Sequence, residues 1–230
     1  MAFRAEPFLW IHLAGVATVP ILLGMCLVGL AIGNPVLPRW LELSLLVLFG
    51  MGPILWMQVI RPFYIFSILF VSVQPDRLTD TQCRMLTRFR NPVGRVIAGF
   101  TSVLLVGTLW QLYYLAPTLT DRIPFQSDLR PVGLLVAAVA FLLVNLFVQV
   151  PVSVLHILFT QKAALTATPP YPVEQIRQDF MIPGFWVRQI WPFALNEALH
   201  QASPAPSGPH LPEPNLKQTQ DLTGEDSSNA

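Results

Sequence analysis

The feature that most constrains this chain is an uncharged apolar stretch near its N-terminus, residues 8–33, which reads FLWIHLAGVATVPILLGMCLVGLAIG. An α-helix rises about 1.5 Å per residue, so a stretch of this length crosses a hydrocarbon core of roughly 30 Å. It is also longer than the apolar part of a cleaved signal peptide, so we expect an uncleaved first span. Lipid rather than water is therefore the expected surroundings of this segment.

Further apolar stretches predict an all-α, polytopic membrane protein with four transmembrane helices. We expect the spans at about residues 8–32, 41–60, 96–115 and 132–159. The composition agrees, because only 12% of the 230 residues are charged and the mean hydropathy is +0.54. A soluble domain carries roughly 25% charged residues.

Two of the expected spans contain residues that interrupt a helix. Pro20 lies in the middle of the first span and removes one backbone hydrogen bond, so we expect a kink there. Gly50, Gly52 and Pro53 cluster within the second span. They predict a bend, and small residues allow another helix to approach closely.

An apolar segment of about 11 residues at 63–73, FYIFSILFVSV, follows the second span. It is too short to cross the membrane as a helix, and Arg61 with Pro62 separates it from the span before it. We expect an interfacial helix. A re-entrant segment and a continuation of the second span are the alternatives.

The polar loop at 74–95 contains a helix signal. Thr79 followed three residues later by Gln82 forms a capping box, which predicts a short helix at about 80–89. Arg84 and Arg88 share one face of it. We expect either a solvated basic face at the lipid headgroups or a docking surface for an acidic partner.

The end of the chain differs in composition from the rest. Residues 169–200 mix aromatic and charged side chains, which predicts amphipathic segments at the membrane interface with their rings, including Phe180, toward the acyl chains. Residues 201–230 lack aromatic side chains and are rich in proline, which is typical of disorder. We therefore expect a membrane domain at 1–200 and a disordered polar tail at 201–230.

The distribution of basic residues predicts the orientation of the spans. With four spans both termini lie on one side, and ten Lys and Arg residues fall on that side against three on the other, leaving the tail aside. The positive-inside rule then places both termini in the cytoplasm. The two sets are Arg4, Arg61, Arg77, Arg84, Arg88, Arg90, Arg95, Lys162, Arg177 and Arg188 against Arg39, Arg122 and Arg130.

Catalytic signatures do not stand out in the sequence. It contains no P-loop, no zinc-protease motif, no nucleophile elbow and no dinucleotide-binding glycine pattern. We place Glu42 at the mouth of the second span, and no Asp or Glu lies deep in a span, which argues against proton-coupled transport. We expect no catalytic residues and no metal site, and the formal charge of +1 argues against nucleic-acid binding.

Two histidines are candidate cofactor ligands. His12 lies near the start of the first span and His156 near the end of the fourth, so the predicted topology puts both at a similar depth. Neutral imidazole nitrogens at one depth can bind haem or chlorophyll. The alternative is that each imidazole bonds a backbone carbonyl or a lipid headgroup.

Polar residues form the remaining candidate sites. The intramembrane amides Gln58, Asn145 and Gln149 are expected to turn inward, because lipid offers them no partner.

The aromatic residues Trp110, Tyr113 and Tyr114 are expected to form a belt at the membrane surface. The candidate contacts for lipid headgroups or partner subunits are Arg61, Arg84, Arg88 and Arg95.

Three segments carry a resemblance to a known family: MAFRAEPFLWIHLAG at the start, IRPFYIFSILFVSVQPDRLTDTQ in the middle and VNLFVQVPVSVLHILF later. With the low-complexity tail, they resemble a family of cyanobacterial integral membrane proteins known by that tail. The resemblance covers about residues 1–160. It implies a photosynthetic bacterium and a thylakoid or plasma membrane, but no reaction.

These features favour a non-enzymatic membrane protein that contacts other membrane subunits, as an accessory or assembly factor for a photosynthetic complex. The first alternative is a small homo-oligomeric transporter or channel, for which the intramembrane amides would line the path. The second is a haem- or chlorophyll-binding protein that uses His12 and His156.

Overall fold

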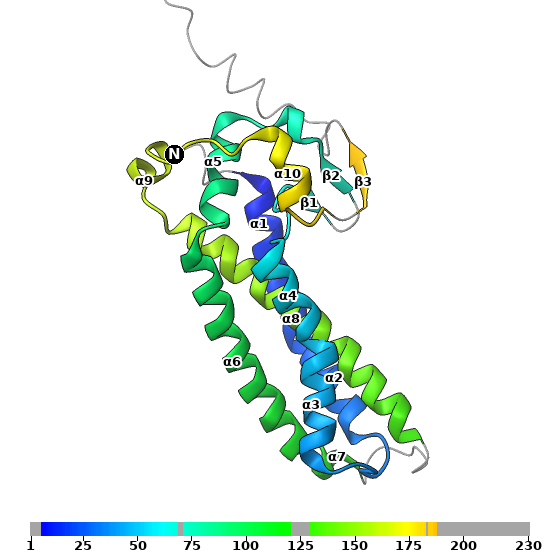
Figure 1. Ribbon diagram of the computed structural model, residues 1–230. Helices are drawn as coiled ribbons and strands as arrows, with labels where there is room; N and C mark the ends of the chain where they lie inside the picture. The colour runs from blue at the N-terminus through cyan, green and yellow to red at the C-terminus, as the bar shows by residue number, and fades with distance from the viewer. Residues whose placement is uncertain (1–5, 69–70, 121–128, 183, 188–230) are drawn as a thin grey trace, which may run out of the picture. The chain divides into compact units, whose positions relative to one another are not determined.

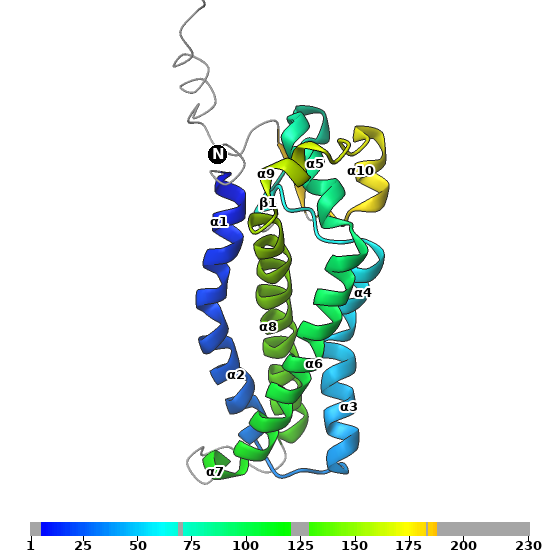
Figure 2. The ribbon, with the colours of Figure 1, turned by 90° about the vertical axis from the view of Figure 1, so that its left-hand side faces the viewer.

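The computed structural model describes residues 6–68, 71–120, 129–182 and 184–187. The predicted tail at 201–230 lies outside the described residues. Long helices run side by side, and a group of short helices and strands gathers at one end of them (Figures 1 and 2). We call this group the cap and define it as the described residues of 61–91 and 160–187.

Among the described residues, three helical segments are long and apolar enough to cross a membrane. The first, Pro7–Ala31, consists of α1 (Pro7–Ala14), the 3-10 turn η2 (Gly15–Thr18) and α2 (Val19–Ala31). The turn ends two residues before Pro20, where the sequence predicts a kink. The other two are α6 (Pro92–Leu115) and α8 (Arg130–Leu158).

The second predicted span is a bent pair of helices. Helices α3 (Arg39–Gly50) and α4 (Gly52–Ile60) pass the same test together but differ in direction by 41°. The break falls at Met51, between the glycines and before Pro53, as expected. Taken as one span, the pair brings the number of spans among the described residues to four.

The predicted helix in the polar loop is confirmed as α5 (Asp80–Phe89), and its capping box is present. The backbone nitrogen of Thr79 donates to Gln82 Oε1 at 2.9 Å, and the Gln82 backbone nitrogen donates to Thr79 Oγ1 at 3.4 Å. Gln82 also donates from Nε2 to the Glu6 carboxylate at 3.3 Å. The capping residue therefore ties α5 to the start of the first span.

Other short elements complete the described chain. They are η3 (Pro75–Arg77), α7 (Pro117–Thr120), α9 (Lys162–Thr166) and α10 (Val173–Asp179).

The expectation of an interfacial helix at 63–73 is wrong. The segment forms strands β1 (Ser67–Ile68) and β2 (Val71–Val73), which pair antiparallel, and β3 (Phe185–Val187) adds in parallel to β2. Aromatic and β-branched side chains favour the extended backbone. The partner strand lies more than a hundred residues further along the chain, so local sequence could not reveal it.

The cap shares an apolar core with α1 and α8. Tyr64, Ile65 and Phe66 are completely buried, and Phe180 is 2% exposed. The Tyr64 and Phe180 rings meet edge to face with their centroids 6.5 Å apart. The expected orientation of Phe180 toward the acyl chains is therefore wrong, because the ring packs inside the protein.

Helix α8 is the central element of the spans, since it packs against α1, α2, α3 and α6 (Figure 2). Glycines permit its closest contacts. A Cβ placed on Gly133 would lie 2.5 Å from the carbonyl oxygen of Gly29, and one placed on Gly50 would lie 2.7 Å from the ring of Phe141. The backbones of α2 and α8 therefore meet at a distance that only glycine allows.

This contact predicts that Gly133→Ala destabilises the protein by about 1–3 kcal/mol, because the new methyl group overpacks the α2–α8 contact. Gly107→Ala on α6 is the matched control, since nothing lies within 4 Å of its Cβ position. Thermal unfolding of the two purified variants in one detergent measures the difference. Equal midpoints would contradict the close approach of α2 and α8.

Candidate functional site

A buried ion pair joins two helices at the end of the spans opposite the cap. Glu42 lies in the first turn of α3 and is fully buried, while Arg130 begins α8 and is 3% exposed. Arg130 Nε donates to Glu42 Oε1 at 3.2 Å, and Nη2 also contacts this carboxylate. The hydroxyl of Tyr113 donates to Glu42 Oε2 at 2.8 Å.

Arg130 also binds the end of the first span. Its Nη1 donates to the carbonyl oxygens of Leu30 at 2.6 Å and Ile32 at 3.3 Å. One guanidinium therefore connects the start of α8 with the start of α3 and the end of α2. Helix ends have unpaired carbonyl groups, and this cation satisfies some of them.

Sequence reasoning missed this cluster. Glu42 was expected at the mouth of a span, Arg130 among the loop cations and Tyr113 in an aromatic belt, but all three are buried together. Trp110 and Tyr114 are about half exposed, at 49% and 52%, as a belt requires. One signal in the sequence could have revealed the pair. Glu42 and Arg130 carry opposite charges and lie at the starts of the second and fourth spans, which enter the membrane from the same side.

The cluster predicts that Glu42→Gln or Arg130→Met alone lowers the free energy of unfolding by about 3–5 kcal/mol, because each leaves a buried charge without its partner. The double variant should lose less than the sum of the two single changes, because it removes both charges. Chemical unfolding in detergent micelles measures all three. Additive losses would show that the two side chains act independently.

The intramembrane amides of α8 turn inward as expected. Asn145 is fully buried and Gln149 is 1% exposed. Asn145 Nδ2 donates to the Phe141 carbonyl at 2.8 Å, and Gln149 Nε2 donates to Ser102 Oγ on α6 at 3.1 Å. The first bond lies within α8, and the second links α8 to α6 inside the spans.

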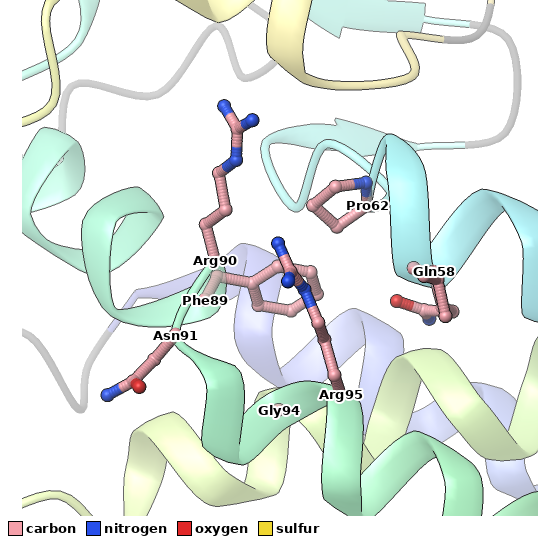
Figure 3. Close-up of a pocket in the computed structure, with 8 residues that line it drawn as sticks. Gln58, Pro62, Phe89, Arg90, Asn91, Gly94 and Arg95 are labelled. Carbon is pink, nitrogen blue, oxygen red and sulfur yellow. The ribbon is translucent and has the colours of Figure 1, made fainter.

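Gln58 does not join these amides but lies beside a narrow cavity near the cap. The cavity holds about 10 Å³, roughly one water molecule, and lies between α4, the end of α5 and the start of α6. Figure 3 shows Gln58 and Arg95 extending toward the space beside Phe89, whereas Asn91 points away. Gln58 Nε2 is buried and has no hydrogen-bond partner among the described residues.

A second charged contact closes the cap. Arg90, just after α5, forms an ion pair with Asp179 at the end of α10, and the Tyr171 hydroxyl donates to the same carboxylate. The Tyr171 hydrogen bond and the Arg90 guanidinium lower the pKa of Asp179 more than burial raises it. Burial and the neighbouring carboxylate raise the pKa of Tyr171. The contact holds α10 against α5.

The pKa of Asp179 predicts how the cap responds to acid. Because the folded-state pKa lies below the ordinary value of 3.8, the contact stabilises the fold above pH 3.8 and is lost as the pH falls through the folded pKa. The protection of the α10 amides against hydrogen exchange, taken relative to the intrinsic exchange rate at each pH, should therefore fall in acid. Asp179→Asn should show lower protection at neutral pH and little further loss on acidification, and an unchanged acid response in this variant would contradict the assignment.

The two histidines lie toward the cap end of the spans but have different neighbours. His12 Nδ1 donates to the Phe8 carbonyl at 2.7 Å, and its ring meets Phe63 with centroids 5.7 Å apart. His156 lies near Arg88, and its Nε2 is buried without a partner among the described residues. Across the described residues no group of three or more His, Cys, Asp and Glu side chains converges as a metal site would.

The four candidate arginines occupy different environments in and beside the cap. Arg61 and Arg95 are exposed, while Arg84 and Arg88 are partly buried. Arg84 donates from Nη1 to the Thr166 carbonyl at the end of α9. The face of α5 that carries Arg84 and Arg88 therefore packs partly against the protein, although both remain candidates for lipid or partner contact.

Comparison with known protein families yields a match. The profile of the family described as low-complexity tail membrane protein-like matches residues 5–192. The match extends beyond the segments that carry the resemblance in sequence and includes the cap elements α10 and β3. No curated protein and no solved structure matches the chain.

Proposed function

The chain belongs to the low-complexity tail membrane protein-like family, and we propose that it is a non-enzymatic accessory or assembly factor that binds other membrane subunits. It is a membrane protein, and its apolar helices place it in the bilayer. The proposal concerns what it contacts there.

The observation that carries this proposal is the outer face of α6. Gly99 and Gly107 lie eight residues apart, and no atom lies within 4 Å of a Cβ placed on either. Phe100 and Val103 are also exposed, at 66% and 69%. Glycine on a lipid-facing helix costs helix propensity, and close packing against another helix would offset that cost.

The interior of the spans supports a contact function over a transport function. The amides of Asn145 and Gln149 form hydrogen bonds within the protein, and Glu42 is paired with Arg130. A transport path would require polar groups that face a continuous opening. The small homo-oligomeric transporter or channel is therefore the weaker alternative, and the haem- or chlorophyll-binding protein rests on His12 and His156.

The location that we propose follows from the resemblance and the charges. The resemblance implies the thylakoid or plasma membrane of a photosynthetic bacterium. The arginines at 61, 84, 88 and 95 then face the cytoplasm, with both termini on the same side.

The proposal predicts that Gly99→Leu with Gly107→Leu removes most of the membrane subunits that co-purify with the wild-type protein in mild detergent. The added side chains block helix approach, and no atom lies within 4 Å of either Cβ position. Gly24→Leu is the matched control, because its Cβ position on α2 is equally open. Affinity purification with quantitative mass spectrometry measures the recovered subunits.

The same purification separates the alternatives. Recovery of a single-species oligomer would favour the transporter or channel, and a visible chromophore band that is lost in His12→Ala would favour the cofactor-binding protein. Equal recovery of partner subunits with the α6 double variant and with Gly24→Leu would overturn the assignment of α6 as the contact face.

A further inference from the structure

A groove at the junction of α5, the end of α8 and α9 contains side chains that the proposed function does not use. Its volume is about 310 Å³, and it is open to the outside. The residues that line it are Arg88, His156, Phe159, Thr160, Gln161 and Ala164. It lies where a span ends at the cap, which is the depth of lipid headgroups if the spans cross a bilayer.

Two nitrogen atoms beside this groove have no partner. Arg88 Nε and His156 Nε2 are both buried and form no hydrogen bond with any described residue. A buried polar nitrogen without a partner is costly, and more so when it belongs to a cation. The unused hydrogen-bonding capacity therefore indicates an acceptor that the chain itself does not supply.

The neighbouring arginines show why Arg88 is distinctive. Arg84 donates to the Thr166 carbonyl, and Arg90 is paired with Asp179. No carboxylate is among the described residues that line the groove. The carbonyl of His156 at the end of α8 already accepts a hydrogen bond from Thr160 Oγ1 at 3.0 Å. The charge of Arg88 thus remains available, which selects for an anion and against a metal ion.

The groove also has an apolar wall. Phe159 lines it and is 76% exposed, and Leu155, one turn earlier on α8, is 39% exposed. An anion with an attached acyl chain would place its charge at Arg88 and its chain along these side chains. A free phosphate ion would leave the apolar wall unused.

We propose that this groove binds the phosphate headgroup of an anionic phospholipid, with the terminal nitrogens of Arg88 as donors, His156 beside them and Phe159 against the acyl chain. The guanidinium fork matches phosphate oxygens geometrically. This gives His156 a role other than binding haem or chlorophyll. The inference does not depend on the proposed contact face on α6.

The test uses the full-length protein in mild detergent, titrated with phosphatidylglycerol or phosphatidylcholine and followed by native mass spectrometry. The wild-type protein should retain phosphatidylglycerol in preference to phosphatidylcholine. Arg88→Gln should weaken phosphatidylglycerol binding about tenfold, because it removes a charge-assisted contact. Arg77→Gln is the matched control, since it removes the same charge from an exposed residue outside the groove.

A second variant keeps the test decisive if Arg88→Gln does not fold. Phe159→Ser changes a largely exposed ring and should leave folding intact while weakening phosphatidylglycerol retention. Equal retention by the wild type and by every folded groove variant would overturn the proposal. Displacement of the lipid by inorganic phosphate at low millimolar concentration would overturn the lipid assignment in favour of a soluble phosphate.

Discussion

Lipid offers polar groups no partner, and this constraint governs the arrangement of the spans. The pairing of Glu42 with Arg130 is its clearest consequence, because neither charge could remain in the bilayer alone. Arg130 also binds carbonyl oxygens at the end of α2, so one cation joins three helices at the end opposite the cap. The positions of α2, α3 and α8 relative to one another depend on it.

The same constraint explains the interior contacts nearer the middle of the spans. Gln149 reaches Ser102 on α6, while Gly29 and Gly133 allow α2 and α8 to meet backbone to backbone. Close packing and internal hydrogen bonds hold transmembrane helices together where water cannot drive their association. Helix α8 supplies a partner in each of these contacts and therefore organises the whole set of spans.

Local pattern predicted those parts of the fold that local physics determines. Span positions follow from apolar length, the bend at Met51 from its glycines and proline, and α5 from the Thr79–Gln82 capping box. The features that the sequence did not predict depend instead on contacts between distant segments. The strand at 71–73 needs a partner at 185–187, and Arg130 needs one at Glu42, so both depend on residues far apart in sequence. The inward orientation of the Asn145 and Gln149 amides was predictable, because lipid offers them no hydrogen-bond partner.

The arginines of the two ends show how position decides what a cation does. Arg130 is only 3% exposed and is committed to neighbours within the chain. In the cap, Arg84 and Arg90 likewise bind the chain, and they hold α9 and α10 in place. Arg88 differs because its neighbours are a histidine and an exposed phenylalanine rather than an acid or a carbonyl. The contacts that fix the cap thus leave one cation of α5 facing a groove at the membrane boundary, where the available anions belong to lipids.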